Sequence, residues 1–100
     1  MEKKVISIGR ADCHFCEILF YELVEIHKLN PYFIVDSVEP ELFTDFKKHF
    51  GINRFPAVQV DNGTDFITIH MDKDYPDTLN YILVNNVGEM INKTLELISE

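Results

Sequence analysis

Basic residues are scarce in this sequence. Nine lysines and arginines stand against 17 aspartates and glutamates, which gives a formal net charge of -8. Binding to a phosphate backbone requires a basic surface, so this balance argues against nucleic acid as a partner. The same excess of negative charge disfavours attachment to anionic membranes.

Long apolar runs are also missing. No stretch approaches the ~20 apolar residues that a membrane-spanning helix needs. The apolar run behind the charged first residues, Val5–Ile8, is too short for the hydrophobic region of a signal peptide. We therefore expect a cytoplasmic protein that does not associate with a membrane.

Only two cysteines occur, Cys13 and Cys16, with two residues between them. A disulfide that closes so small a ring cannot hold a fold together, so we expect no purely structural role. In a reducing cytosol a C-x-x-C pair indicates redox chemistry or metal binding. Zinc would need two further ligands, and His27 and His49 fall near the far ends of predicted helices. We therefore expect no metal site.

The remaining composition is that of a globular domain. The hydrophobic fraction of 46% and the charged fraction of 26% are ordinary values, which excludes a disordered chain. The sequence contains no linker, repeat or low-complexity segment, so residues 1–100 form one domain. A chain of this length buries about two thirds of its unfolded surface, which is enough for one core.

The first half of the chain alternates strands with amphipathic helices. The helices begin at Asp12, a good N-cap residue, and at Pro40, and they end before Pro31 and at Gly51. The strands are Lys4–Ile8 and Tyr32–Val35, and the second is a continuous apolar run that we expect to be buried on both faces. Inward faces of the two helices carry Cys16, Leu19, Phe20, Leu23 and Val24, and Leu42, Phe43, Phe46 and Phe50.

The second half predicts a hairpin and a long helix. Asn62–Gly63 is a strong hairpin signal between the strands Ala57–Val60 and Phe66–Ile69. Pro76 begins a helical stretch that Gly88 interrupts. This stretch is either one kinked helix or two short helices, and the sequence does not distinguish them. Its apolar stripe is Leu79, Ile82, Leu83, Val87, Met90, Ile91, Leu95 and Ile98. The order β-α-β-α-β-β-α predicts an α/β fold with a four-stranded mixed sheet flanked by helices.

The position of the C-x-x-C pair predicts different roles for its two cysteines. Cys13 falls at about the first position of the first helix, and Cys16 lies one turn further on the same face. Free backbone N–H groups and the helix dipole favour the thiolate of Cys13 over a free thiol of pKa about 8.5. Cys16 is expected to stay protonated and buried. This predicts that Cys13 attacks a disulfide and that Cys16 resolves the mixed disulfide.

The strand–C-x-x-C–helix beginning, the β-α that follows it and the segment Gly51–Ala57 resemble the thioredoxin/glutaredoxin superfamily. The resemblance implies a thioredoxin fold with Cys13 and Cys16 as the catalytic pair. It also implies that Pro56 is a cis-proline facing the cysteines. Phe55 would then present its backbone groups to an incoming peptide or to glutathione.

Features of both branches of the superfamily are present. Phe15, before the second cysteine, is similar to glutaredoxins, whereas Phe50–Pro56 is similar to the thioredoxin pattern. Arg10 matches the position of the glutaredoxin lysine that binds a carboxylate of glutathione. Arg54, the only other arginine, is expected beside the cysteines as well. Together the two arginines would form a local positive spot suited to a carboxylate or a thiolate.

Two neighbours of Cys13 have opposite expected effects. A cationic His14 would stabilise the Cys13 thiolate and make the protein more oxidising. Asp12 acts against the thiolate through its own charge and by capping N–H groups that would otherwise serve the sulfur.

These features predict a small electron carrier that catalyses thiol–disulfide exchange, either glutaredoxin-like or thioredoxin-like. Its partners would be a disulfide-containing protein or a glutathione mixed disulfide, with glutathione or a reductase as electron donor. We expect a monomer with no bound cofactor and with glutathione as a candidate co-substrate. The expected substrate-binding residues are Arg10, His14, Phe15, Arg54, Phe55 and Pro56. Two alternatives stay open: a redox-inert thioredoxin-fold binding module that uses the groove at Pro56, and a cluster shared between two subunits.

Overall fold

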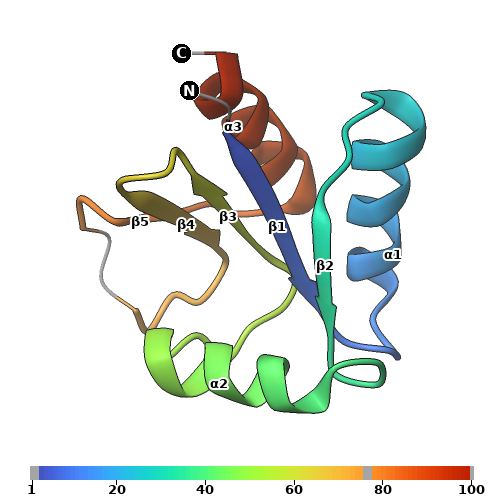
Figure 1. Ribbon diagram of the computed structural model, residues 1–100, viewed down its shortest axis with the longest axis vertical. Helices are drawn as coiled ribbons and strands as arrows, with labels where there is room; N and C mark the ends of the chain where they lie inside the picture. The colour runs from blue at the N-terminus through green and yellow to red at the C-terminus, as the bar shows by residue number, and fades with distance from the viewer. Residues whose placement is uncertain (1–2, 76–77, 100) are drawn as a thin grey trace.

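Five strands form one mixed sheet in the order β2-β1-β3-β4-β5 in a computed structural model, which describes residues 3–75 and 78–99 (Figure 1). β1 runs parallel to β2 and antiparallel to β3, β4 is antiparallel to β3, and β5 is parallel to β4. The α/β class and the mixed sheet are confirmed, but the sheet has one strand more than predicted. The strands are β1 (Lys4–Gly9), β2 (Tyr32–Val35), β3 (Ala57–Asp61), β4 (Phe66–His70) and β5 (Tyr81–Leu83).

Helices cover both faces of this sheet. One core cluster joins residues of α1 (His14–Tyr21), of the π-helical turn η1 (Glu22–Ile26) and of α3 (Val87–Ser99) to one face. A second cluster joins residues of α2 (Pro40–Phe50) to the opposite face. Within the part of the chain that the structure describes, no helix is long and apolar enough to span a membrane.

The first helix begins and ends differently from the prediction. Its N-cap is Cys13 rather than Asp12, because the Cys13 sulfur accepts the hydrogen bond from the N–H of Cys16. Helical structure ends at Ile26, since the chain turns at Lys28 with a φ of 57° before it reaches Pro31. Within the predicted inward stripe, the clearest exception is the 47% exposed side chain of Phe20.

β2 is half-buried, which corrects the prediction that it is buried on both faces. It lies at the edge of the sheet and pairs only with β1 within the described residues. Tyr32 is exposed, and Phe33, Ile34 and Val35 are partly buried. The ring of Phe33 packs at 4.5 Å, centroid to centroid, against the ring of Phe20. A continuous apolar run therefore does not distinguish a central strand from an edge strand that a helix partly covers.

The second helix and the hairpin follow the prediction closely. α2 buries Phe43 and Phe46 and ends at Gly51, whose φ of 70° lies in the region that glycine favours. Leu42, by contrast, is exposed rather than inward. The hairpin pairs β3 with β4 through the loop that begins with Asn62–Gly63. These elements bring the segment before β3 beside the start of α1.

The C-terminal region corrects the prediction most. Residues 81–83 form β5 rather than helix, and Leu79 is 95% exposed. Pro76, the predicted start of the helix, lies outside the described residues. α3 begins only at Val87, because the Asn86 side chain accepts the N–H of Glu89, whose own carboxylate accepts the N–H of Asn85. Gly88 consequently lies in the first turn and interrupts nothing.

Candidate functional site

A disulfide joins Cys13 and Cys16 between β1 and α1, with 5.1 Å between the two Cα atoms. β1 ends at Gly9, and α1 begins immediately after Cys13. The cysteine pair therefore lies at the first turn of the helix, beyond the carboxyl end of β1. Both cysteines are partly buried. For Cys16 this corrects the expectation of a buried residue and leaves its sulfur partly accessible.

The Cys13 sulfur lies among backbone groups. The N–H of Cys16 donates to Cys13 Sγ at 3.1 Å, and the N–H of Glu17 donates to the Cys13 carbonyl at 3.1 Å. On its other side, Cys13 Sγ lies 3.8 Å from the carbonyl oxygen of Phe55. In the disulfide the sulfur carries no proton, so this last approach is a contact. An N-cap sulfur that accepts an N–H is well placed to carry negative charge after reduction.

The peptide bond between Phe55 and Pro56 is cis, as the resemblance implied. Pro56 is fully buried, and the ring of Phe55 packs at 4.8 Å, centroid to centroid, on the ring of Phe43 from α2. The side chain of Phe55 is therefore held by the core while its carbonyl group faces Cys13. The structure thus brings Phe55 to the disulfide, and the buried Pro56 follows it directly in the chain.

Cys16 depends on the absence of a side chain at Gly9. A Cβ atom at Gly9 would lie 3.1 Å from both Cβ and Sγ of Cys16. A larger residue at the end of β1 would therefore require Cys16 to shift by a few tenths of an ångström. A cavity of about 230 Å³ opens beside Cys16, with Phe20, Phe33 and Val35 among its walls. The second sulfur consequently has mainly apolar surroundings.

Arg10 lies near the disulfide, but it is not an isolated cation. Its Nε atom is 3.5 Å from Asp36 Oδ2, and Asp36 Oδ1 accepts the N–H of Ala11 at 2.7 Å. Asp36 was not among the predicted residues. A signal existed, because Asp36 follows β2 and the carboxyl ends of the parallel strands β1 and β2 meet at one edge of the sheet.

A cavity of about 500 Å³ lies at Cys13, and Arg10, Asp12, His14 and Asp36 are among its lining residues. His14 is exposed and its ring lies 5.8 Å from the ring of Phe15, centroid to centroid. With one arginine and two aspartates, this cavity is not the positive spot that was expected. Among the described residues, no group of three or more histidines, cysteines, aspartates and glutamates could hold a metal ion.

Arg54 lines a different cavity, of about 380 Å³, together with Lys73 and Met71 from the segment after β4. Phe15 and Phe55 line this cavity as well as the one at Cys13. The structure therefore separates the two arginines that the sequence placed together. Lys73 and Met71 were missed, because no local signal in the sequence places the segment after β4 beside Arg54.

Asp72 connects this segment to the residues that precede Pro56. Its buried carboxylate accepts the N–H of Asn53 at 3.3 Å and the N–H of Asp74 at 3.1 Å. The N–H of Asp72 in turn donates to Nδ1 of the buried His70 at 3.1 Å. Asp72 thus fastens the segment after β4 to the residues before Pro56, a link that the sequence did not reveal.

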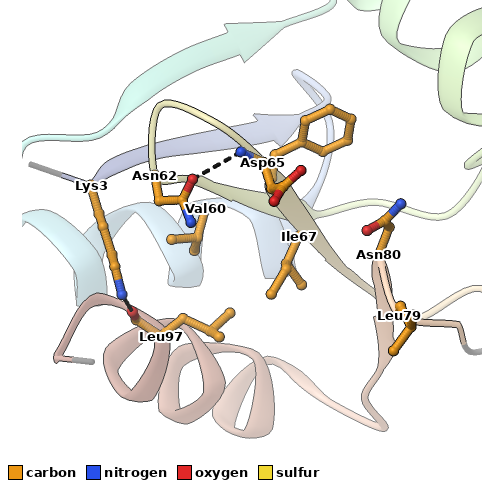
Figure 2. Close-up of a pocket in the computed structure, with 9 residues that line it drawn as sticks. Lys3, Val60, Asn62, Asp65, Ile67, Leu79, Asn80 and Leu97 are labelled. Atoms are coloured by element: carbon orange, nitrogen blue, oxygen red, sulfur yellow. Dashed lines mark hydrogen bonds between the residues drawn. The ribbon is translucent and has the colours of Figure 1, made fainter. Parts of the chain in front are cut away.

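A further cavity, of about 290 Å³, lies away from the cysteines (Figure 2). It is bounded by the β3–β4 hairpin and by α3, and Lys3 spans it to donate a hydrogen bond to the carbonyl oxygen of Leu97. Leu79 and Asn80 from the segment before β5 complete its rim. None of the predicted site residues lines this cavity.

Comparisons with known proteins assign no family to the chain: no protein-family model matches it, and no curated protein matches it.

Proposed function

We propose that this chain is a thiol–disulfide oxidoreductase of the thioredoxin/glutaredoxin superfamily, with Cys13 and Cys16 as its redox pair. The observation that carries the proposal is the position of Cys13 Sγ. It caps α1, accepts the Cys16 N–H at 3.1 Å and lies beside the carbonyl group that precedes a cis-proline. A thiolate at this position is stabilised by backbone dipoles and remains open to a cavity.

The proposed reaction proceeds in two exchange steps. The Cys13 thiolate attacks one sulfur of a substrate disulfide, and the other substrate sulfur leaves as a thiolate with the electron pair of the broken bond. Cys16 then loses its proton and attacks the Cys13 sulfur, which releases the second substrate thiolate. Two electrons pass from the dithiol to the substrate, and protons are exchanged through solvent. A thiol donor, either glutathione or a reductase, restores the Cys13–Cys16 dithiol.

The arrangement of elements supports a thioredoxin-like fold for the same proposal. β1 and β2 are parallel with α1 between them, α2 leads to β3, and β3 and β4 form a hairpin. β5 extends this plan at one edge of the sheet without displacing the strands that carry the cysteines and Pro56. The proposed partner is a disulfide-containing protein, and the proposed compartment is the cytoplasm.

Disulfide reduction with two electron donors tests the proposal. The chain is given insulin or a small disulfide, first with glutathione and glutathione reductase and then with thioredoxin reductase. We expect NADPH consumption with one of the two systems and none when Cys13→Ser replaces the wild type. Absence of turnover with both systems, although the protein is folded, would favour a redox-inert binding module instead. A titration of the Cys13–Cys16 couple in glutathione buffers then measures its potential.

A further inference from the structure

The cavity that contains Arg54 has an unusual charge for this chain. It is called the basic groove below, and its argued residues are Phe15, Arg54, Met71, Lys73 and Val87. Arg54 and Lys73 are exposed cations, and within residues 3–75 and 78–99 no carboxylate lines the groove. In a protein with 17 acidic and nine basic residues, a cavity with this lining favours an anionic partner.

The cations of the basic groove differ from Arg10 in their pairing. Arg10 is held by Asp36, whereas in the described part of the chain neither Arg54 nor Lys73 forms an ion pair. A carboxylate that approaches Arg10 meets the negative charge of Asp36 close to the guanidinium. Among the described residues, no carboxylate forms an ion pair with Arg54 or Lys73. The anion-binding side of the disulfide is therefore the side of the basic groove.

Apolar surface accompanies this charge. Phe15, between the two cysteines, is 57% exposed, and Met71 and Val87 line the groove beside it. An exposed aromatic ring in the same cavity as two cations that have no ion pair within residues 3–75 and 78–99 suits a partner that offers an apolar side chain and a carboxylate together. Because Phe15 and Phe55 also line the cavity at Cys13, such a partner would place a neighbouring sulfur within reach of Cys13.

We propose that the basic groove selects the substrate, and that the substrate is a polypeptide whose disulfide cysteine is flanked by an acidic and an apolar residue. The proposal rests on the thiol–disulfide exchange proposed above and adds the substrate class. Glutathione carries carboxylates but no apolar side chain, so it would interact with Arg54 and Lys73 but not with the apolar residues of the basic groove.

Matched peptides with one activated cysteine test this assignment. Each peptide is joined to thionitrobenzoate as a mixed disulfide, and its cysteine is flanked by Glu and Leu, Gln and Leu, Lys and Leu, or Glu and Gly. Cys13 attacks the peptide sulfur, coloured thionitrobenzoate leaves with the electron pair, and Cys16 then releases the peptide thiol. The leaving group is the same in every peptide, so differences in the first rate report on the flanking residues. The mixed disulfide of glutathione is the fifth substrate.

We expect the Glu–Leu peptide to react about tenfold faster than the Lys–Leu peptide at low salt, since complementary charge acts mainly on association. The Glu–Gly peptide and glutathione should fall between them. The preference should vanish at about 1 M salt, where the screening length is about 3 Å. Replacing both cations, as Arg54→Gln with Lys73→Gln, should reduce it to about twofold or less.

A matched double variant separates the groove from the net charge. Lys28→Gln with Lys48→Gln removes two exposed lysines outside the groove and should retain the full preference. Equal rates for all peptides, a preference that survives in the Arg54 and Lys73 double variant, or glutathione as the fastest substrate would each overturn the substrate assignment. Failure to release thionitrobenzoate from any peptide would instead overturn the proposed exchange activity. Circular dichroism of each variant verifies that it is folded.

Discussion

The two sulfurs of one disulfide have very different surroundings. Cys13 caps α1, accepts a backbone N–H and borders a cavity of about 500 Å³ that contains Asp12, His14 and Asp36. Cys16 lies one turn further along the helix, against Gly9 and a cavity with aromatic walls. After reduction, we expect the backbone N–H to favour a thiolate at Cys13 and the mainly apolar lining to disfavour one at Cys16. For the proposed exchange activity, we therefore expect the position of each sulfur relative to the start of the helix to determine which one attacks first.

The strongest test of this comparison replaces each sulfur in turn. Cys13→Ser should abolish all exchange, because no other thiol lies at the helix start. Cys16→Ser should still attack a disulfide but should remain as a mixed disulfide, which intact mass spectrometry detects. In the reduced wild type, iodoacetamide at neutral pH should alkylate Cys13 before Cys16. Faster alkylation of Cys16 would show that the proposed roles are reversed.

Gly9→Val tests the Cys16 side separately. The new side chain would begin 3.1 Å from the Cys16 sulfur and would push it away from Cys13. We expect release of the substrate thiol to slow by about tenfold, because small displacements of reacting atoms are costly, while the first attack by Cys13 is little changed. Single-turnover kinetics separate the two steps. Equal slowing of both would point to general damage to the fold, which a urea titration would reveal.

Asp36→Asn tests the charge balance on the Cys13 side. Asparagine retains an acceptor for the Ala11 N–H but no longer neutralises Arg10. We expect the rate with oxidised glutathione to rise about threefold at low salt, because the negative charge that opposes an incoming carboxylate is removed. The stability of the fold should change little, since an exposed ion pair contributes little to it. Asp45→Asn on α2 makes the same change in net charge and should leave the rate unchanged. Adding Arg10→Ala to Asp36→Asn should cancel the gain, and a gain that persists would exclude Arg10 as its cause.

The smallest expected effect lies on the α2 face, away from both sulfurs. Burial, followed by a hydrogen bond with Tyr75, raises the pKa of Tyr81 from 10.0 to about 12. The folded state therefore favours the neutral phenol, and this contribution to stability is complete below pH 10 and is lost as the pH rises towards 12. Tyr81→Phe should lose less stability over that interval than the wild type, as urea unfolding at several pH values would measure.

Tyr21→Phe, on the exposed side of α1, is the control for this variant. Tyr81→Phe should also leave the exchange rate at neutral pH unchanged. A lower rate would show that the α2 face and the disulfide are coupled.

Much of the fold could be predicted because its signals are local. The helix from Pro40 to Gly51 and the Asn62–Gly63 hairpin were predicted correctly, since caps and turns depend on a few neighbouring residues. β5 could not be distinguished from a helix, because a run as short as 81–83 fits both the two-residue period of a strand and the ~3.6-residue period of a helix. Asn86 and Glu89 did form a capping pair that could have placed the start of α3.

The candidate site could be predicted from the sequence only where its residues are neighbours in the chain. Cys13 and Cys16 were found from their spacing, and the cis bond before Pro56 from the resemblance. Asp36, Asp72 and the basic groove depend on contacts between distant segments, which no local pattern contains. Even the cap of α1 was misassigned, because Asp12 is the better N-cap by propensity while the geometry of the turn gives that position to the Cys13 sulfur.

The lengths of the strands have a consequence for the behaviour of the protein in concentrated solution. β1, β3 and β4 span 6, 5 and 5 residues and lie inside the sheet, whereas the strands at its edges, β2 and β5, span only 4 and 3. Exposed strand edges are templates on which further chains add and aggregate, and shortness is one of the ways in which natural sheets limit this. The short strands β2 and β5 cover the interior strands and leave few backbone groups on which another copy could add, so we expect β5 to limit self-association through β4.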